Sequence, residues 1–387
     1  MRHGTLRSAS VPIRGFHTMV GGNRVTLLHE GAAYFAAMLE AIAEARREIL
    51  VEMYWFASDG TGWRFADALR ARAREGVDVR VMYDAVGSWE TDEGLFEAMR
   101  ADGCAVEDYN PIAPWRRRFN LGVVNNRDHR KMLVVDGRVG FTGGVNLGDE
   151  WAPESEGGHG WRDDVIRIEG PAVRAMRALF EHTWQSMRGR GALTAEVGPQ
   201  PPFEGGTAVQ VLADRRPGGS RAIRRAYLDR IRYARERIHI TNSYFVPDRA
   251  VRRALADAAS RGVDVRVLVQ GESDLPAVYF AGRHAYDWLL RHGVRLYEWH
   301  GSILHAKSAV VDDRWVAVGT YNLDWRSWRF NLEIVVAVED ARVGRAMEER
   351  FRRDLAQSVE VELRNWRYRP LSDRALESFF HLFRKLL

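Results

Sequence analysis

The sequence predicts an α/β fold built from two similar lobes, each with helices on both sides of a sheet. Predicted strands alternate with helices along the chain, which is typical of α/β layers. The hexapeptide Gly-Val-Asp-Val-Arg-Val occurs at 76–81 and again at 262–267. A pair of polar motifs, one in each half, also repeats with the same internal spacing. These repeats indicate an internal duplication, so the expected architecture is a pseudo-dimer of two α/β/α sandwiches within one polypeptide.

The first half shows alternating helix and strand signals after a loosely ordered lead-in, residues 1–22. Apolar residues at helical spacing, such as Tyr34, Met38 and Ile42, predict the first helix. Gly76 directly follows the second helix, at a position where glycine commonly ends helices. The predicted elements are a helix over 31–47, a strand over 48–56, a helix over 63–75, a strand over 77–83 and a helix over 95–101.

The second half repeats this order after a linker rich in glycine and proline, placed at 189–206. Its predicted elements are a helix over 222–235, a strand over 238–244, a helix over 249–260 and a strand over 263–269. We therefore divide the chain into a first lobe over 23–195, a second lobe over 205–360 and a C-terminal amphipathic helix over 361–387.

The C-terminal stretch has apolar residues at helical spacing with cations beside them. The apolar stripe consists of Leu371, Ala375, Leu376, Phe379, Phe380, Phe383, Leu386 and Leu387. Such a helix can lie in the surface plane of a membrane. The alternative is that this face packs on the body of the protein, as amphipathic helices more commonly do. An insertion over 110–125, which carries Trp115 and basic residues, leaves a similar choice between a membrane interface and a solvated loop.

Each half contains His-x-Lys, then four residues and an aspartate, and later a small-residue turn that ends in asparagine. The first copy consists of His129, Lys131, Asp136 and the turn Gly143–Asn146, and the second of His305, Lys307, Asp312 and the turn Gly319–Asn322. A match of this length at identical spacing is hard to obtain by chance. The two copies are therefore the strongest functional signal in the chain.

Strand periodicity fixes the local geometry of each motif. An apolar run after each His-x-Lys predicts a strand, in which residues i and i+2 point to the same face. His129 and Lys131 are therefore expected side by side, as are His305 and Lys307. The Asp-Gly or Asp-Asp that follows each run indicates a tight hairpin turn. The returning strand would bring the asparagine of each motif back towards its histidine.

The expected set of imidazoles, ammonium groups and amides suits a tetrahedral phosphate. Lysine and asparagine can hold the non-bridging oxygens and stabilise charge that develops in the transition state. One histidine can attack phosphorus while the other protonates the leaving alcohol. Imidazole titrates near neutral pH, so one ring can be neutral while the other is charged. This chemistry requires no metal and no cofactor, because the lysines supply the positive charge.

These residues resemble the duplicated His-Lys-Asp motif of the phospholipase D superfamily, and the resemblance extends over roughly residues 21–387. Bacterial cardiolipin synthase is the subfamily that the chain resembles most, through the segments 53–56, 83–88, 126–131, 168–173 and 242–247. The resemblance implies a bilobal enzyme of two phospholipase D-like lobes with one active site at their junction. It also implies a covalent phosphohistidine, from which an alcohol or water then takes the phosphoryl group.

Residue roles follow from the same resemblance. The catalytic set is His129, Lys131, Asp136, His305, Lys307 and Asp312, with the two aspartates mainly structural. A later acidic residue orients each histidine. Glu333, 28 residues after His305, fits this role in the second half, and Asp163 fits it in the first, with the adjacent Asp164 as an alternative to Asp163. Substrate binding falls to Asn146, Asn322 and Thr320. Further candidates for the substrate pocket, at strand ends that should approach the site, are Glu52, Tyr54, Asp84, Asn242 and Tyr244.

Two features depart from the family pattern. Gly144 stands in the first turn where Thr320 supplies a small hydroxyl residue in the second. Many cardiolipin synthases begin with two membrane-spanning helices, and no apolar run of that length occurs here.

The composition favours a protein with anionic partners. The chain has 387 residues with 46% hydrophobic content, which is enough for two domain-sized cores. Its net charge of +5 favours nucleic acid or acidic lipid surfaces without choosing between them. A single cysteine, Cys104, excludes an intramolecular disulfide and fits a reducing compartment. We expect a cytoplasmic protein that is peripheral on the inner face of the cell membrane.

The expected function is a phosphatidyltransferase that forms cardiolipin from two phosphatidylglycerol molecules and releases glycerol. His129 would be the nucleophile and His305 the acid, an assignment that follows the family and could be reversed. The alternatives are a phospholipase D-type hydrolase, or a nuclease or phosphodiesterase, on the same scaffold. The insertion and the C-terminal stretch favour anionic phospholipid over nucleic acid, and no obligate protein partner is predicted.

Overall fold

The computed structural model describes residues 18–113, 120–121, 124–187, 193, 195, 197–213 and 221–386. Most of the predicted lead-in, the aromatic and basic residues 115–119 of the insertion, and parts of the linker lie outside this range. Leu387, the last residue of the predicted apolar stripe, does as well.

Strands and helices alternate in both halves. The first half contains β1 (Val20–Leu28), α1 (Gly31–Ala43), β2 (Glu48–Met53), α2 (Gly60–Arg74), β3 (Asp78–Asp84), α3 (Glu93–Ala101), β4 (Ala105–Tyr109), β5 (Met132–Val135), β6 (Val139–Gly143), β7 (Val165–Glu169) and α4 (Val173–Ser186). The second half contains β8 (Thr207–Ala213), α5 (Ala222–Tyr233), β9 (Arg237–Asn242), α6 (Arg249–Ser260), β10 (Asp264–Gln270), α7 (Pro276–Arg283), α8 (Tyr286–Arg291), β11 (Arg295–Trp299), β12 (Lys307–Val311), β13 (Trp315–Gly319), α9 (Trp325–Arg329), β14 (Ile334–Glu339), α10 (Ala341–Leu355), β15 (Ser358–Glu360), α11 (Leu363–Trp366) and α12 (Leu371–Leu382).

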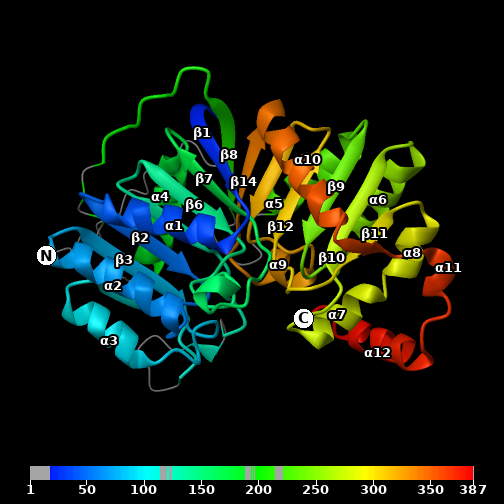
Figure 1. The fold of residues 1–387 in the computed structure, drawn as a ribbon, viewed down its shortest axis with the longest axis horizontal. Coiled ribbons are helices and arrows are strands. Elements are labelled where there is room, and N and C mark those ends of the chain that lie inside the picture. Colours follow the sequence, from blue (N-terminus) through cyan, green and yellow to red (C-terminus); the bar gives the residue numbers. More distant parts are fainter. Residues whose placement is uncertain are drawn as a thin grey trace, which may run out of the picture.

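The order of the strands shows the duplication directly. It runs β15-β11-β10-β9-β12-β13-β14-β8-β1-β7-β6-β5-β2-β3-β4, which apart from β15 reads the same from either end in terms of equivalent strands. The pseudo-two-fold axis passes between β1 and β8, which pair antiparallel. The two lobe sheets therefore join edge to edge at the centre of the molecule (Figure 1). This arrangement confirms the predicted α/β fold with two similar lobes.

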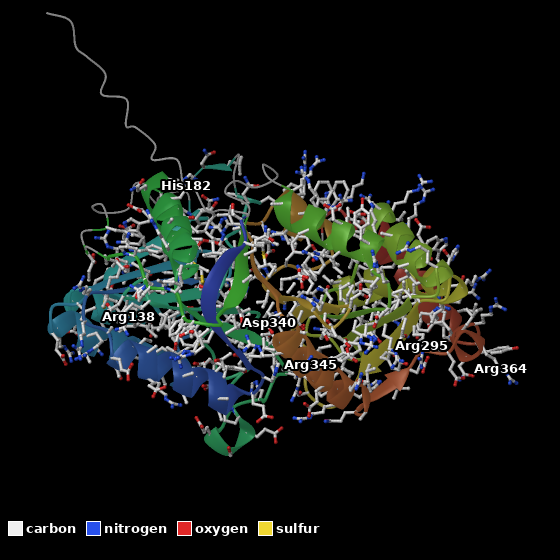
Figure 2. All side chains as sticks on the ribbon, turned by 90° about the horizontal axis from the view of Figure 1, so that it is seen from above. Arg138, His182, Arg295, Asp340, Arg345 and Arg364 are labelled. Atoms are coloured by element: carbon white, nitrogen blue, oxygen red, sulfur yellow. The ribbon has the colours of Figure 1, made fainter. Side chains whose placement is uncertain are left out.

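Helices cover both faces of each sheet. In the first lobe α1, α2 and α3 pack on one face, and in the second α5, α6 and α8 do so. Alternate residues of one strand enter different cores, as with Leu133 and Val134 of β5. The core that contains Val134 also holds Val310 and Val336 of the second lobe, so the lobes share one apolar interior. Outward-pointing arginines such as Arg345 and Arg364 place much of the positive charge on the surface (Figure 2).

Local signals account for the hairpins and for several helix starts. The turns between β5 and β6 and between β12 and β13 contain Asp136, Gly137, Asp312 and Asp313, all with φ between 51° and 56°. These left-handed residues fit the tight turns predicted for both motifs. The side chain of Asp59 accepts a hydrogen bond from the Gly62 amide (2.8 Å) and begins α2.

Strand β1 is the main element that the sequence reasoning missed. It begins at Val20, inside the predicted lead-in, and pairs with β7 as well as β8. The side chain of Asn23 fixes the seam between the lobes, because its Nδ2 donates to the backbone carbonyl of Thr207 (3.2 Å) and its Oδ1 accepts from the backbone amide of Ala172 (2.9 Å). Among the described helices, none is both long and apolar enough to cross a membrane.

Candidate active site

The junction between the lobes brings the two motifs together through exchanged backbone contacts. The amide of His129 donates to the carbonyl of Leu332 in the second lobe (3.0 Å). The amide of His305 donates in turn to the carbonyl of Arg162 in the first lobe (2.8 Å). Each histidine is therefore placed by a segment from the opposite lobe, and both side chains are buried.

Each histidine also takes its carboxylate partner from the opposite lobe. Nδ1 of His129 lies 3.0 and 3.1 Å from the two carboxylate oxygens of Glu333. Nδ1 of His305 lies 2.9 Å from Oδ2 of Asp163. When Nδ1 carries the proton for these bonds, Nε2 of each ring has a free lone pair. The order of residues along the chain does not reveal this exchange.

The structure distinguishes Asp163 from its neighbour Asp164. Asp164 accepts hydrogen bonds from Arg162 (2.6 Å) and from the hydroxyl of Ser308 (2.6 Å), and it does not contact His305 through its side chain. Burial would raise the pKa of Asp164, but the charge of Arg162 and the hydrogen bonds from His29 and Ser308 together outweigh it and hold the pKa far below its usual range. The carboxylate at His305 is therefore Asp163, and Asp164 links the two lobes.

Both lysines lie beside their histidines, as strand periodicity predicts. Nζ of Lys131 donates to the carbonyl of His129 (2.8 Å), and Nζ of Lys307 donates to the carbonyl of His305. Burial lowers the pKa of Lys131 to about 7 and that of Lys307 to about 8. Bound phosphate would favour the charged ammonium in this dry environment.

The two histidine–carboxylate pairs differ in their protonation. Burial lowers the pKa of His129 to about 4, and burial together with Lys307 holds the pKa of His305 well below its usual value. Burial raises the pKa of Asp163 to about 7. For Glu333, burial is outweighed by His129 and its hydrogen bonds, so its pKa lies below the ordinary value. At neutral pH the Asp163–His305 pair is thus the one that more readily holds a proton.

Aromatic rings enclose both histidines. Tyr54 contacts His129 edge to face with ring centroids 5.0 Å apart, and Tyr244 contacts His305 at 5.7 Å. Trp151 and Trp161 also pack against His305, at 5.3 and 5.9 Å. The sequence reasoning placed the two tyrosines here but missed both tryptophans, because they lie between the first motif and Asp163 without a repeated counterpart.

The two turns explain the glycine that departs from the family pattern. The hydroxyl of Thr320 donates to Glu333. A Cβ atom at Gly144 would lie 2.4 Å from Oδ1 of Asp163 and 2.7 Å from the carbonyl oxygen of His305. There is therefore no room for a side chain in the first turn. The Nε1 of Trp151 donates to Asp163 (3.0 Å) and supplies the bond that threonine provides to Glu333.

The two asparagines are buried at the ends of the turns. Oδ1 of Asn146 accepts from the backbone amide of Trp55 (3.1 Å), and Oδ1 of Asn322 accepts from the hydroxyl of Ser243 (3.3 Å). These bonds orient each side-chain amide with its nitrogen available as a donor.

The structure does not bring Asp136 or Asp312 to the histidines. Each lies at the far end of its strand, beyond β5 or β12, and binds backbone amides there. Asp136 accepts from the amides of Arg47 (2.8 Å) and Glu48 (2.9 Å), and Asp312 accepts from that of Glu236 (2.8 Å). Both aspartates therefore hold the backbone that leads into β2 and β9, which is the mainly structural role that the family resemblance implies for them.

Three other pocket candidates also have structural partners. Glu52 accepts from the guanidinium of Arg130 (2.9 Å), and both groups are fully buried. Asp84 accepts from the backbone amides of Val86 (2.8 Å) and Asp128 (2.8 Å). Oδ1 of the Asn242 side chain accepts from the backbone amide of Leu323 (3.1 Å).

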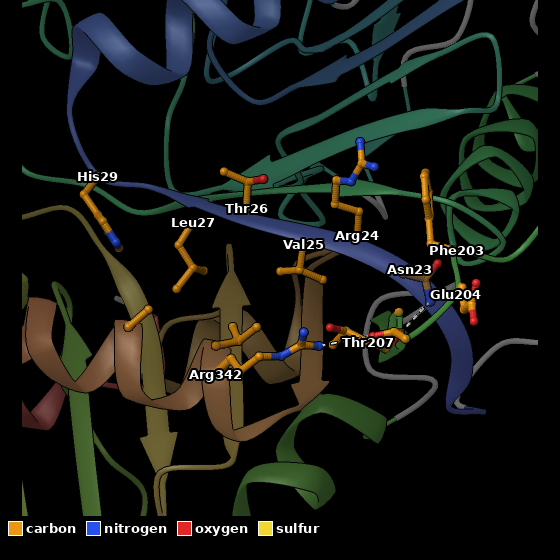
Figure 3. Close-up of a pocket in the computed structure, with 14 residues that line it drawn as sticks. Asn23, Arg24, Val25, Thr26, Leu27, His29, Phe203, Glu204, Thr207 and Arg342 are labelled. Atoms are coloured by element: carbon orange, nitrogen blue, oxygen red, sulfur yellow. Dashed lines mark hydrogen bonds between the residues drawn. The ribbon is translucent and has the colours of Figure 1, made fainter.

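An open groove of about 590 Å³ lies away from the histidine pairs, along β1 and α10 (Figure 3). Its lining includes Val25, Leu27, Arg342 and His29. Nδ1 of His29 lies 2.7 Å from Asp164, so this groove reaches the back of the polar network at the lobe junction.

Comparison with known proteins agrees with this geometry. The family model described as "Cardiolipin synthase, PLD-like domain" matches residues 38–184 and 227–355. The cardiolipin synthase of Geobacillus thermodenitrificans is 34% identical over 376 residues, which cover 96% of this chain and 74% of that protein. The probable cardiolipin synthase of Bacillus subtilis is 32% identical over 377 residues, which cover 97% of this chain and 75% of that protein.

A solved structure shares the fold at much lower sequence identity. The phosphatidylserine synthase of Haemophilus influenzae superposes with a TM-score of 0.73 at 15% identity, covering 94% of this chain and 95% of that one. At this identity the likeness supports the two-lobed architecture alone.

Proposed function

The chain belongs to the cardiolipin synthase family of PLD-like proteins, and from this membership we propose how its own residues join two phosphatidylglycerol molecules into cardiolipin. It is a phosphatidyltransferase of the phospholipase D superfamily. The observation that carries the proposal is the pair of buried histidines, each bound through Nδ1 to a carboxylate of the opposite lobe. Its substrate is a phospholipid, and we take the donor and the acceptor to be phosphatidylglycerol at a membrane surface.

The first half-reaction forms a covalent intermediate. Nε2 of neutral His129 attacks the phosphorus atom, and the bond from phosphorus to the glycerol headgroup oxygen breaks. The departing oxygen takes a proton from the Asp163–His305 pair, and glycerol leaves. A low pKa keeps His129 neutral at pH 7, while the raised pKa of Asp163 keeps a proton near His305. This difference favours His129 as the nucleophile.

The second half-reaction transfers the phosphatidyl group. A glycerol hydroxyl of another phosphatidylglycerol gives its proton to His305 and attacks phosphorus, which releases His129 and completes cardiolipin. Lys131 and Lys307 would stabilise the non-bridging oxygens in both steps, with the amide nitrogens of Asn146 and Asn322 as further donors. Burial makes these charges more effective than they would be in water.

The test is to incubate the purified chain with phosphatidylglycerol vesicles and identify the lipid products and glycerol by mass spectrometry. Cardiolipin with glycerol is expected, and His129→Ala and His305→Ala should each abolish it. The exposed His159 offers a matched control, and His159→Ala should retain the parent rate. If active protein releases only phosphatidic acid, the chain is a hydrolase and the transfer step is refuted.

A further inference from the structure

Helix α12 places apolar side chains in solvent instead of against the protein. Leu371 is 76% exposed, Leu382 72% and Leu386 63%. Leu376, Phe379 and Phe383 are exposed on the same segment. Most of the predicted apolar stripe therefore faces solvent, whereas its member Phe380 is half-buried on the side that packs against the protein.

The opposite side of α12 is the one that anchors it. Glu377 is almost completely buried and accepts hydrogen bonds from Arg369, the shortest of them 2.6 Å. Phe380 stacks on Phe280 of α7 at 6.1 Å between ring centroids. α12 lies along α7 at the outer edge of the second lobe (Figure 1). Arg283 of α7 also lies 3.6 Å from Glu377, and His381 stacks on His284 with ring centroids 4.0 Å apart. The helix is therefore fixed on the protein by ion pairs and ring contacts on this side, while its apolar stripe stays available.

This stripe borders the second-lobe side of the active site. Leu275, which is exposed, precedes α7 and follows Asp274, whose carboxylate accepts a hydrogen bond from the Tyr244 hydroxyl (2.6 Å). The ring of Tyr244 packs against His305. One short path of contacts thus connects the catalytic imidazole with the exposed apolar segment.

The C-terminal end of the stripe also reaches the first motif. Arg326 of α9 donates both to the carbonyl of Leu386 (3.3 Å) and to the side chain of Asn125 (3.0 Å). Asn125 lies just before His129 in the chain. The end of the stripe is therefore held at the rim between the two lobes.

The first lobe adds exposed apolar residues on its own side of the rim. Trp89 is 70% exposed, and Val86 is exposed in the same loop after β3. Ser88 of this loop donates to the carbonyl of Tyr54 (3.4 Å), and Tyr54 packs against His129. Leu121, before the first motif, is 78% exposed.

We define the docking face as Val86, Trp89, Leu121, Leu275, Leu371, Leu376, Phe379, Leu382, Phe383 and Leu386. We propose that this face inserts into the headgroup layer of an anionic phospholipid bilayer and holds the junction of the lobes at the lipid headgroups. This inference rests on the proposed function, because the substrate proposed there is a phospholipid in a membrane. The exposed cations Arg374 and Lys385 flank the stripe and fit anionic lipid better than a neutral partner surface.

A triple variant of the stripe tests the proposal. Phe379→Ser, Leu382→Ser and Leu386→Ser together change only exposed side chains, and the matched control is Tyr233→Ser with Val359→Ser, two exposed apolar residues on α5 and β15. Binding to phosphatidylglycerol vesicles is measured by co-sedimentation. Cardiolipin formation is measured with vesicles and with short-chain phosphatidylglycerol below its micelle concentration.

The triple variant should bind vesicles at least tenfold more weakly and act on them at least tenfold more slowly. Its rate on monomeric short-chain substrate should stay within twofold of the parent, and the control should match the parent throughout. A second variant, Arg374→Glu with Lys385→Glu, should weaken binding to anionic vesicles and shows the same dependence if the triple variant does not fold.

Unchanged vesicle binding by both variants would overturn the proposal. A solution dimer that the triple variant dissociates, with no vesicle binding by the parent, would assign the face to a second copy of the chain and also overturn it. Vesicle binding that requires the stripe, without cardiolipin formation, would instead support the docking face and refute the proposed function.

Discussion

Replacing Glu333 by glutamine tests the assignment of His129 as nucleophile. Glu333 is fully buried and accepts from Nδ1 of His129 (3.0 Å), from Thr320 and from the side chain of Asn331 (3.3 Å). Glutamine keeps the size of the side chain, but its NH₂ group must face one of these donors. If it faces His129, the ring proton moves to Nε2 and the attacking lone pair is lost.

The expected loss follows from equivalent changes in other catalytic sites. Exchange of a histidine-orienting carboxylate for its amide in a serine protease triad lowers kcat by about 10⁴-fold. We expect about 10³–10⁴-fold here, which is roughly 4–5.5 kcal/mol of transition-state stabilisation. The fold should persist, because the glutamine side chain has nearly the same size as that of Glu333.

The assay compares two leaving groups in single-turnover experiments. With phosphatidylglycerol, both Glu333→Gln and Asp163→Asn should be slow. With a p-nitrophenyl phosphodiester, whose leaving group needs no acid, Asp163→Asn should recover a burst of p-nitrophenolate and Glu333→Gln should not. The opposite pattern, a burst in Glu333→Gln and none in Asp163→Asn, would refute the assignment and make His305 the nucleophile.

Three further predictions concern pH, lobe contact and the first turn. The pH profile of kcat/KM should be bell-shaped. Activity should fall below about pH 4 as His129 becomes protonated, and above about pH 7 as the Asp163–His305 pair loses its proton. Asp163→Asn should move the upper limb of this profile. Arg162→Met leaves the buried carboxylates of Asp164 and Asp354 without their shared cation, so urea unfolding should show a loss of about 3–5 kcal/mol. Gly144→Ala should lower kcat at least tenfold by displacing Asp163, whereas Gly198→Ala, where a Cβ atom meets nothing within 4 Å, should match the parent; equal rates in both would contradict the close-approach argument.

The sequence by itself determined the local chemistry of this protein. His-x-Lys on a strand places imidazole and ammonium side by side because side chains alternate between faces. The Asp-containing turns specify the hairpins β5–β6 and β12–β13 through left-handed residues such as Asp136 and Asp312. These features depend on residues close together in the chain, so repeated motifs were sufficient to predict them.

Only the tertiary structure decided which groups meet across the lobes. Pairing of His129 with Glu333, and of His305 with Asp163, depends on how two lobe sheets join at β1 and β8, and no local pattern encodes that contact. The choice between adjacent aspartates likewise depends on strand register, since a shift of one residue turns a side chain to the other face. The orientation of α12 was open for a related reason: periodicity shows that an apolar stripe exists, but the burial of Glu377 against Arg369 decides which side of the helix faces the protein.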